Sequence, residues 1–287
     1  MKNKLFENIM QAIFLILGLI AVGFVLLISF YLIISGIPAI LEIGVFKFLF
    51  SKSWAPTSPQ ENFGILPFIL TSIYGTSGAV LIGLPIGFFS AVYLSKFAPK
   101  KIKLIAESAI NLLAGIPSVV YGLVGMLVLV PLIKIIFSLP DGASLLAAIL
   151  VLSLMILPSI IKVSINALEA VPKEYEYASL ALGATETETV FKVSVKAAKS
   201  GIATAVVLGV CRVVGEAVAV IMVSGNVANM PSLFQSVRFL TSAVASEMAY
   251  SSGLHRNALF SIALVLFLFI MIINITLNFF IKRDRKG

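Results

Sequence analysis

Six long apolar runs, separated by more polar joints, constrain this 287-residue chain more than any other feature of its sequence. A membrane-spanning helix needs about 20 consecutive apolar residues, and here 60% of residues are hydrophobic whereas only 12% are charged. The sequence therefore predicts an all-α, polytopic membrane protein of about six transmembrane helices, forming one domain over residues 1–287. The expected spans are Ala12–Ser35, a stretch within Ile65–Leu94, Ala109–Ile133, Leu145–Ile161, Gly201–Val223 and Ala258–Phe280.

The basic residues are distributed unevenly between the two sides of this layout. Most of the 21 Lys and Arg residues lie in one set of joints, which includes both chain ends, Lys162 and the segment Val171–Ser200. Because cytoplasmic loops are enriched in Lys and Arg, this distribution predicts that both termini and that segment are cytoplasmic. The net charge of +8 therefore reports orientation in a membrane and indicates no nucleic-acid partner.

Residues that commonly carry catalysis or bind metals are scarce. Cys211 is the single cysteine and His255 the single histidine, so an internal disulfide, a zinc cluster and a Ser/His/Asp triad are poorly supplied. The sequence has no G-x-x-x-x-G-K-[ST] phosphate loop, so ATP-driven work needs another subunit. We expect a transport protein without catalytic residue, metal or cofactor, in which His255 is an interfacial or helix-cap residue and Cys211 an apolar filler.

One apolar run contains two charged residues, Arg212 and Glu216, in LGVCRVVGEAVAV. Four residues apart, they are expected to share one face of a helix and to pair. That face otherwise consists mostly of small residues, which allow close helix packing, namely Ala205, Gly209, Gly215 and Ala219. Charges at such depth cost about 2.5 to 3.5 kcal/mol each and usually mark a substrate path or a buried pair. The hypothesis is that Arg212 attracts a passing anion and Glu216 holds Arg212 at rest; a purely structural pair is the alternative.

Glycine and proline interrupt several runs. Gly83, Pro85 and Gly87 in the second span predict either a kink or the close approach of another helix, and Pro117 predicts a kink in the third span. Trp54 lies in an irregular polar joint and is expected to anchor it at the membrane interface. The long joint before the last span could hold a short re-entrant or interfacial helix around Ser232–Tyr250.

The segment Val171–Ser200 is the longest charged interval between apolar runs. A short helix is expected over Val171–Leu182, ending at Gly183, and Thr185 with Glu188 fits a capping box that starts a second helix. Glu188 and Lys192 form a favourable i,i+4 pair. The residues alone leave two interpretations open: a docking surface for a motor protein, or a solvated loop lying on the membrane.

The pattern ASLALGAT, Ala178–Thr185, resembles the EAA loop of ABC importer permeases. When the two are aligned on Gly183, Tyr177 stands where the family has Glu, Ala178 and Ser179 replace its two alanines, and Glu176 lies one position early. Further motifs resemble the C-type permease subunit of phosphate-specific transport (Pst) ABC importers, namely FGILPFILTSIYGT (63–76), GLPIGFFSAVYLSKFAP (83–99), LLAGIPSVVYGL (112–123), LGVCRVVGEAVAVIMVSGN (208–226) and TSAVASEMAYSSGLHRNAL (241–259).

This resemblance implies an ABC importer permease of six spans that moves inorganic phosphate inward by alternating access in the bacterial inner membrane. It implies three partners: a related A-type permease, a dimer of ATPase subunits and an extracytoplasmic phosphate-binding protein. It assigns coupling to the segment 171–200, with Tyr177, Ala178, Ser179 and Gly183 in the coupling loop, and it assigns Arg212 and Glu216 to the substrate pathway. The alternatives are a permease for another oxyanion, such as sulfate, molybdate or phosphonate, and an ion-coupled secondary transporter.

Overall fold

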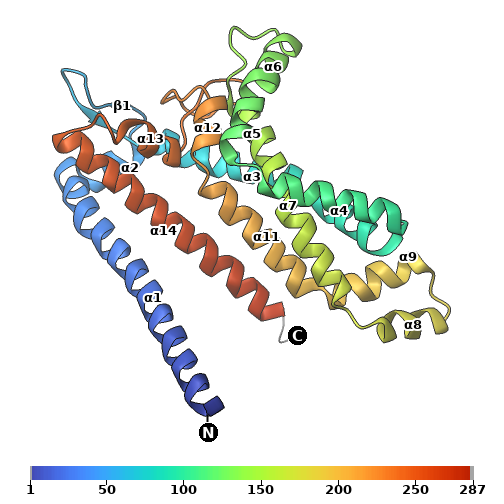
Figure 1. The fold of residues 1–287 in the computed structure, drawn as a ribbon. Coiled ribbons are helices and arrows are strands. Elements are labelled where there is room, and N and C mark those ends of the chain that lie inside the picture. The colour runs from blue at the N-terminus through green and yellow to red at the C-terminus, as the bar shows by residue number, and fades with distance from the viewer. Residues whose placement is uncertain (1, 285–287) are drawn as a thin grey trace.

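The structure, a computed structural model, describes residues 2–284 and consists almost entirely of helices (Figure 1). Within that range, five helices are long and apolar enough to cross a membrane, and a sixth candidate is the pair Glu186–Ala197 and Lys199–Val214, which is bent by 70°. The predicted all-α, multi-span architecture is confirmed. Arg285 and Lys286, which belong to the basic C-terminal end, lie outside the described residues.

The N-terminal helix is longer than predicted. Helix α1 covers Lys2–Ile43 and leads through α2 (Val45–Phe50) to a small hairpin in which β1 (Trp54–Ala55) pairs antiparallel with β2 (Asn62–Phe63). The first part of α1 extends away from the other helices, and near its end α1 packs along α14 (Gly253–Asp284) (Figure 1). The Ser261 hydroxyl donates to the Gly36 carbonyl at 2.6 Å, which fixes this contact.

Two helices form the centre of the molecule, α3 (Leu66–Val92) and α7 (Leu145–Glu169). Helix α3 continues as a π-helical turn, η1 (Tyr93–Phe97). A Cβ atom on Gly83 would lie 2.6 Å from Ile156 Cδ1 and 3.0 Å from the Ser153 carbonyl oxygen, so the two helices meet where α3 has no side chain. The predicted close approach at Gly83 is confirmed.

The prediction for the third span, Ala109–Ile133, is wrong at its start. Helix α4 (Lys100–Gly115) ends at an extended residue, Ile116, and a new helical run follows as α5 (Ser118–Val124), η2 (Gly125–Leu129) and α6 (Val130–Ile136). The reason is Pro117, which disfavours helical backbone at the residue before it and therefore breaks the helix instead of kinking it. The candidate span is Ser118–Ile136, and α4 is a separate helix.

The second half of the chain begins with the short helices α8 (Lys173–Ala181), α9 (Glu186–Thr189), η3 (Val190–Ser194) and α10 (Val195–Ala197). The predicted fifth span is divided into α11 (Lys199–Val214) and α12 (Val218–Val223). A short helix, α13 (Leu240–Glu247), lies in the joint where one was expected.

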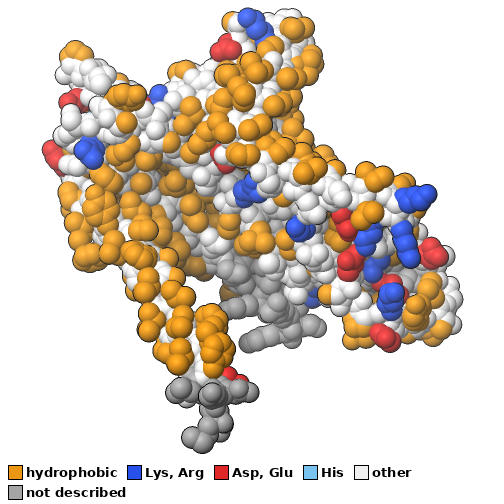
Figure 2. Space-filling view, in the orientation of Figure 1, with side chains coloured by type: hydrophobic (Ala, Val, Ile, Leu, Met, Phe, Trp, Pro, Cys, Tyr) orange, Lys and Arg blue, Asp and Glu red, His pale blue; other side chains and the backbone are white. Residues whose placement is uncertain are grey.

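The surface is segregated by polarity. Figure 2 shows hydrophobic side chains over α1 and the middle of the molecule, whereas charged side chains gather at the end formed by α4, α8 and α9. An apolar surface of this extent suits a lipid environment or contacts with partner helices. The charged end is the part of the described chain that suits water.

Candidate translocation pathway and coupling segment

Arg212 lies in the last turn of α11, beside the central helix α7. Its guanidinium is half-buried, and Nη1 donates to the Ser159 hydroxyl of α7 at 3.3 Å. Among the described residues, no carboxylate lies within 4.0 Å of this guanidinium. The side-chain hydrogen bond of Arg212 is therefore made to a neutral hydroxyl.

Glu216 does not continue the face of α11 on which Arg212 lies. The helix ends at Val214, and Glu216 belongs to the non-helical link before α12. Its carboxylate accepts the Ala219 N–H at 3.0 Å and caps the first turn of α12, while its carbonyl accepts the Thr241 hydroxyl at 2.7 Å. The predicted pairing of Arg212 with Glu216 on one continuous helix is therefore wrong, because Glu216 serves a new helix start.

The small residues predicted to line this face differ in their burial. Ala205, Gly209 and Ala219 are buried, and Gly209 packs against Ile160 of α7, as expected of small residues at a helix interface. Gly215, however, is exposed at the helix break. The link between α11 and α12 thus presents backbone, rather than a packed side chain, next to Arg212.

The predicted coupling segment, residues 171–200, has the local structure that its sequence predicts. Gly183 has a φ of +87°, which ends α8, and the Thr185 hydroxyl accepts the Glu188 N–H at 3.2 Å to open α9. The Glu188 carboxylate accepts a hydrogen bond from the Thr185 N–H at 3.2 Å and forms an ion pair with Lys192 at 2.9 Å. The hydrogen bond from Lys192, with the contacts from Thr185, lowers the pKa of Glu188 to about 2.

Glu176 anchors this segment to the helices that enter the bundle. Its carboxylate pairs with Lys96 of η1 and accepts the Ser194 hydroxyl of η3 at 2.8 Å. The Ser179 and Thr189 hydroxyls share a hydrogen bond of 2.9 Å between α8 and α9. The sequence pattern gave Glu176 no role, although Glu176 is the acidic residue nearest to the position where the resembling family has Glu.

The outer side of α8 presents apolar side chains to solvent. Tyr177 is 63% exposed and Leu182 is 89% exposed, with Leu180 beside them. Of the predicted coupling residues, Ala178 and Gly183 are also exposed, whereas Ser179 is partly covered by its contact with Thr189. The structure thus brings these residues together on one helix–turn–helix unit, at a different end of the molecule from the helix break (Figure 1).

A second polar cluster, centred on Glu247, was not predicted. The Glu247 carboxylate accepts the Trp54 indole N–H at 3.1 Å, contacts His255 Nε2 at 2.9 Å and forms an ion pair with Arg238. Arg238 also donates to the Asn226 carbonyl at 2.9 Å, and these residues border a cavity of about 630 Å³. His255 is therefore a partner of Glu247. The sequence could not indicate this contact, because Glu247 and its three partners lie in separate parts of the chain.

The sequence of the chain matches a family model over residues 83–286, that of the binding-protein-dependent transport system inner membrane component. The chain belongs to this family of permeases. The match starts in α3 and includes the predicted coupling segment and helices α11 and α12. Membership states the class of protein, a multi-pass membrane permease, and leaves the transported substrate open.

Several curated proteins resemble this permease over most of its length. A probable ABC transporter permease protein, YqgH of Bacillus subtilis, is 41% identical over 89% of this chain and 86% of its own length. The phosphate transport system permease protein PstC of Pasteurella multocida is 33% identical over 84% and 81%, respectively. A probable phosphate transport system permease protein PstC of Methanocaldococcus jannaschii is 31% identical over 92% and 89%.

Solved structures show the same fold at lower sequence identity. The inward-facing MetNI methionine ABC transporter matches with a TM-score of 0.57 and 19% identity, covering 77% of this permease and 94% of that chain. A bacterial alginate ABC transporter matches with a TM-score of 0.59 and 14% identity, covering 95% and 94%. At these identities the likeness establishes the ABC importer permease fold.

Proposed function

We propose that this permease is the transmembrane subunit of an ATP-driven importer that moves inorganic phosphate inward by alternating access. The observation that carries the proposal is the half-buried Arg212 guanidinium, which has a neutral partner and lies beside a helix break. Non-helical backbone inside a span is tolerated where it is buried in protein or lines a water-filled cavity, and Gly215 in this break is exposed. The identity of the anion is inferred from the relatives in P. multocida and M. jannaschii, whose names specify phosphate.

The proposed assembly contains three partners. A related A-type permease completes the pathway, a dimer of ATPase subunits docks on the α8–α9 unit, and an extracytoplasmic phosphate-binding protein delivers the anion. The exposed Tyr177 and Leu182 support the docking role, because apolar side chains on an anchored unit suit a protein interface. The permease itself contributes no covalent chemistry in this proposal, and ATP hydrolysis belongs to the docked subunits.

We place the assembly in a bacterial cytoplasmic membrane, with both termini and the coupling segment on the cytoplasmic side. The distribution of Lys and Arg supports this orientation. The charged side chains that gather over α4, α8 and α9 support it as well (Figure 2).

Transport by the reconstituted complex tests the proposal. We expect ATP-dependent phosphate uptake, and we expect Arg212→Gln to reduce that uptake about tenfold or more because a hydrogen bond to a charged group contributes about 1.5 to 3 kcal/mol. Arg212→Lys is the matched control, which keeps the charge and loses the planar donor geometry, so an intermediate loss is expected. Unchanged phosphate uptake by Arg212→Gln would contradict the pathway role.

The same preparation distinguishes the alternative substrates and mechanisms. Stimulation of ATP hydrolysis by sulfate, molybdate or a phosphonate, but not by phosphate, would identify another oxyanion as the substrate. Uptake by this permease alone, driven by an ion gradient and independent of ATP, would identify a secondary transporter.

A further inference from the structure

Helix α7 carries a polar stripe in its cytoplasm-proximal half. Ser159, Lys162, Asn166 and Glu169 follow a spacing of three and four residues, which places them on one face of the helix. Lys162 was expected in a cytoplasmic joint, and in the structure it lies about two turns before the end of α7, which extends to Glu169. An exposed lysine on this polar stripe is accessible to a charged ligand.

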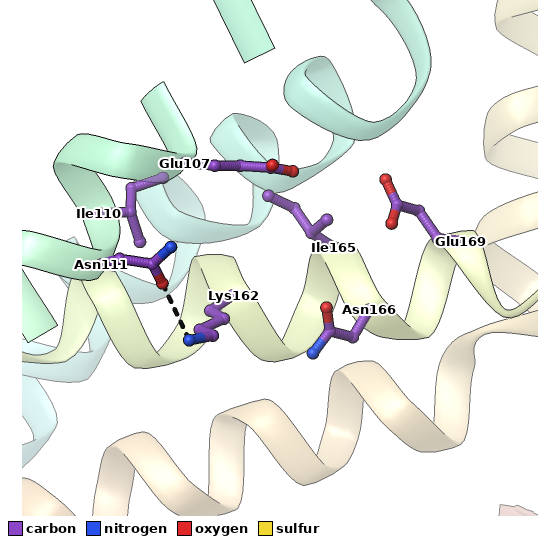
Figure 3. Close-up of a pocket in the computed structure, with 7 residues that line it drawn as sticks. All are labelled: Glu107, Ile110, Asn111, Lys162, Ile165, Asn166 and Glu169. Atoms are coloured by element: carbon purple, nitrogen blue, oxygen red, sulfur yellow. Dashed lines mark hydrogen bonds between the residues drawn. The ribbon is translucent and has the colours of Figure 1, made fainter. Parts of the chain in front are cut away.

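Helix α4 supplies a second polar stripe opposite the first. Lys103, Glu107 and Asn111 are spaced four residues apart and therefore share one face of α4. Between the two stripes lies a cavity of about 210 Å³, shown in Figure 3. Its lining consists of Glu107, Ile110, Asn111, Lys162, Ile165, Asn166 and Glu169.

The carboxylates that line this cavity have a lysine partner, whereas Lys162 has a neutral partner. Lys103 forms an ion pair with Glu169 and lies 3.9 Å from Glu107, so one lysine serves both carboxylates. The ammonium of Lys162 instead donates to the neutral amide oxygen of Asn111 at 2.9 Å (Figure 3). Within the described part of the chain, no carboxylate lies within 4.0 Å of Lys162, and its side chain is exposed.

Lys162 and Arg212 flank the same part of α7. Arg212 contacts Ser159, and Lys162 follows Ser159 by three residues, a rise of about 4.5 Å along the helix. Both cations have neutral partners, and both are accessible from the surface. In Figure 2, basic side chains are exposed over α7 and α11 in the middle of this face. Lys162 and Arg212 each contact a neutral group, and cationic side chains of this kind form charge-assisted hydrogen bonds with an oxyanion.

We propose that Lys162 is the second cationic contact of the transported anion, positioned on the cytoplasmic side of Arg212. The anion passes from the Arg212 guanidinium along the Ser159 hydroxyl to the Lys162 ammonium. It then leaves through the cavity between α4 and α7. Asn111 holds Lys162 in place without neutralising it, which keeps the charge free for the anion. This inference rests on the proposed function, because it adds a second anion contact to the pathway that begins at Arg212.

Uptake of inorganic phosphate by the complete complex tests this role. We expect Lys162→Gln to raise the phosphate concentration for half-maximal uptake about tenfold, since one charge-assisted contact is lost. Lys162→Arg keeps the positive charge and should stay near wild type. Lys134→Gln, which removes an exposed lysine near the end of α6, is the matched control and should have no effect.

Chemical restoration of the charge separates an electrostatic role from a structural one. In a complex without other cysteines, Lys162→Cys should lose uptake. A methanethiosulfonate reagent carrying an ammonium group should restore it, and one carrying a sulfonate should not. Restoration by both reagents, or by neither, would overturn the inference. Failure of Lys162→Gln, Lys162→Met and Lys162→Cys to assemble would establish a structural role and overturn it as well.

The outcomes also separate this inference from the proposed function. If the wild-type complex takes up no phosphate, the proposed function fails first. If the wild type transports phosphate and Arg212→Gln impairs it while Lys162→Gln does not, the Lys162 inference fails alone.

Discussion

The Glu216 carboxylate lies at the start of helix α12. Its carboxylate accepts the Ala219 N–H at 3.0 Å, and a side-chain cap contributes about 1 kcal/mol. We expect Glu216→Gln, whose amide oxygen still accepts a hydrogen bond, to leave stability and apparent phosphate affinity near wild type. Glu216→Ala should lower the free energy of unfolding by about 1 kcal/mol. Thermal unfolding of the purified permease and phosphate titration of the ATPase rate in the complex measure the two quantities.

The alternative role of Glu216, electrostatic restraint of Arg212, gives a different result. Removing the negative charge would then free the guanidinium, and Glu216→Gln would bind phosphate more tightly. A several-fold lower phosphate concentration at half-maximal ATPase activity in Glu216→Gln would therefore contradict the capping role.

The attachment of the coupling segment through Glu176 should depend on pH. Burial raises the pKa of Glu176, but hydrogen bonds from Lys96 and Ser194 and the charges of Lys96 and Lys173 outweigh burial and hold this pKa below 4.5. A carboxyl with a lowered pKa stabilises the folded state above its unfolded pKa, and this contribution is lost as pH falls through the folded value. We expect the segment to stay attached from neutral pH to about pH 5 and to loosen below 4.5.

Hydrogen exchange of residues 173–197, corrected for intrinsic rates, measures this attachment. Glu176→Gln should lower the local opening free energy at pH 7 by about 1 to 2 kcal/mol and remove the part of the pH dependence that comes from Glu176, while that of Glu188 remains. Glu186→Gln, a substitution at an exposed carboxyl of the same segment, is the control. Equal protection of wild type and Glu176→Gln at pH 7 would contradict the anchoring role.

At the scale of elements, the contact between α3 and α7 depends on the missing side chain at Gly83. A Cβ there would lie 3.0 Å from a backbone oxygen of α7, which cannot move aside as a side chain can. We expect Gly83→Leu to lower the free energy of unfolding by about 1 to 3 kcal/mol, as overpacking does. Gly23→Leu is the matched control, because nothing lies within 4 Å of a Cβ at Gly23 on the exposed α1. Equal thermal stability of the two variants would contradict close packing at Gly83.

The elements that could be predicted are those whose signals are local. The capping box at Thr185 and the helix end at Gly183 depend on residues a few positions apart, so their sequence pattern was sufficient. The break after α11 was missed because i,i+4 spacing predicts a pair only if the helix continues. Whether it continues depends on the Glu216 carbonyl, which accepts a hydrogen bond from Thr241 of α13. That contact joins residues that are distant in the sequence.

At the scale of the whole molecule, composition was sufficient to predict the multi-span class, and tertiary contacts decided the rest. An apolar run indicates burial in lipid or protein but does not show what the residues pack against or where a helix breaks. Hydropathy alone therefore could not separate α4 from α5. The Glu247 cluster joins Trp54 of the hairpin to His255 of α14, and no periodic pattern connects them. Helix α7 continues eight residues beyond Ile161, the predicted end of the fourth span, because hydropathy does not show where a helix ends.

The proposed orientation of the whole molecule rests on its distribution of basic residues and is open to a direct test. The layout places the exposed Leu182 of the coupling segment in the cytoplasm and the exposed Thr57 of the hairpin loop outside. Because Cys211 is the only cysteine, Cys211→Ser gives a chain without cysteines for single-site labelling. We expect a membrane-impermeant maleimide added to spheroplasts to label Thr57→Cys and to leave Leu182→Cys unlabelled until the membrane is permeabilised. The alternation of sides along the chain requires both results, so labelling of Leu182→Cys from outside would invert the proposed path of the anion.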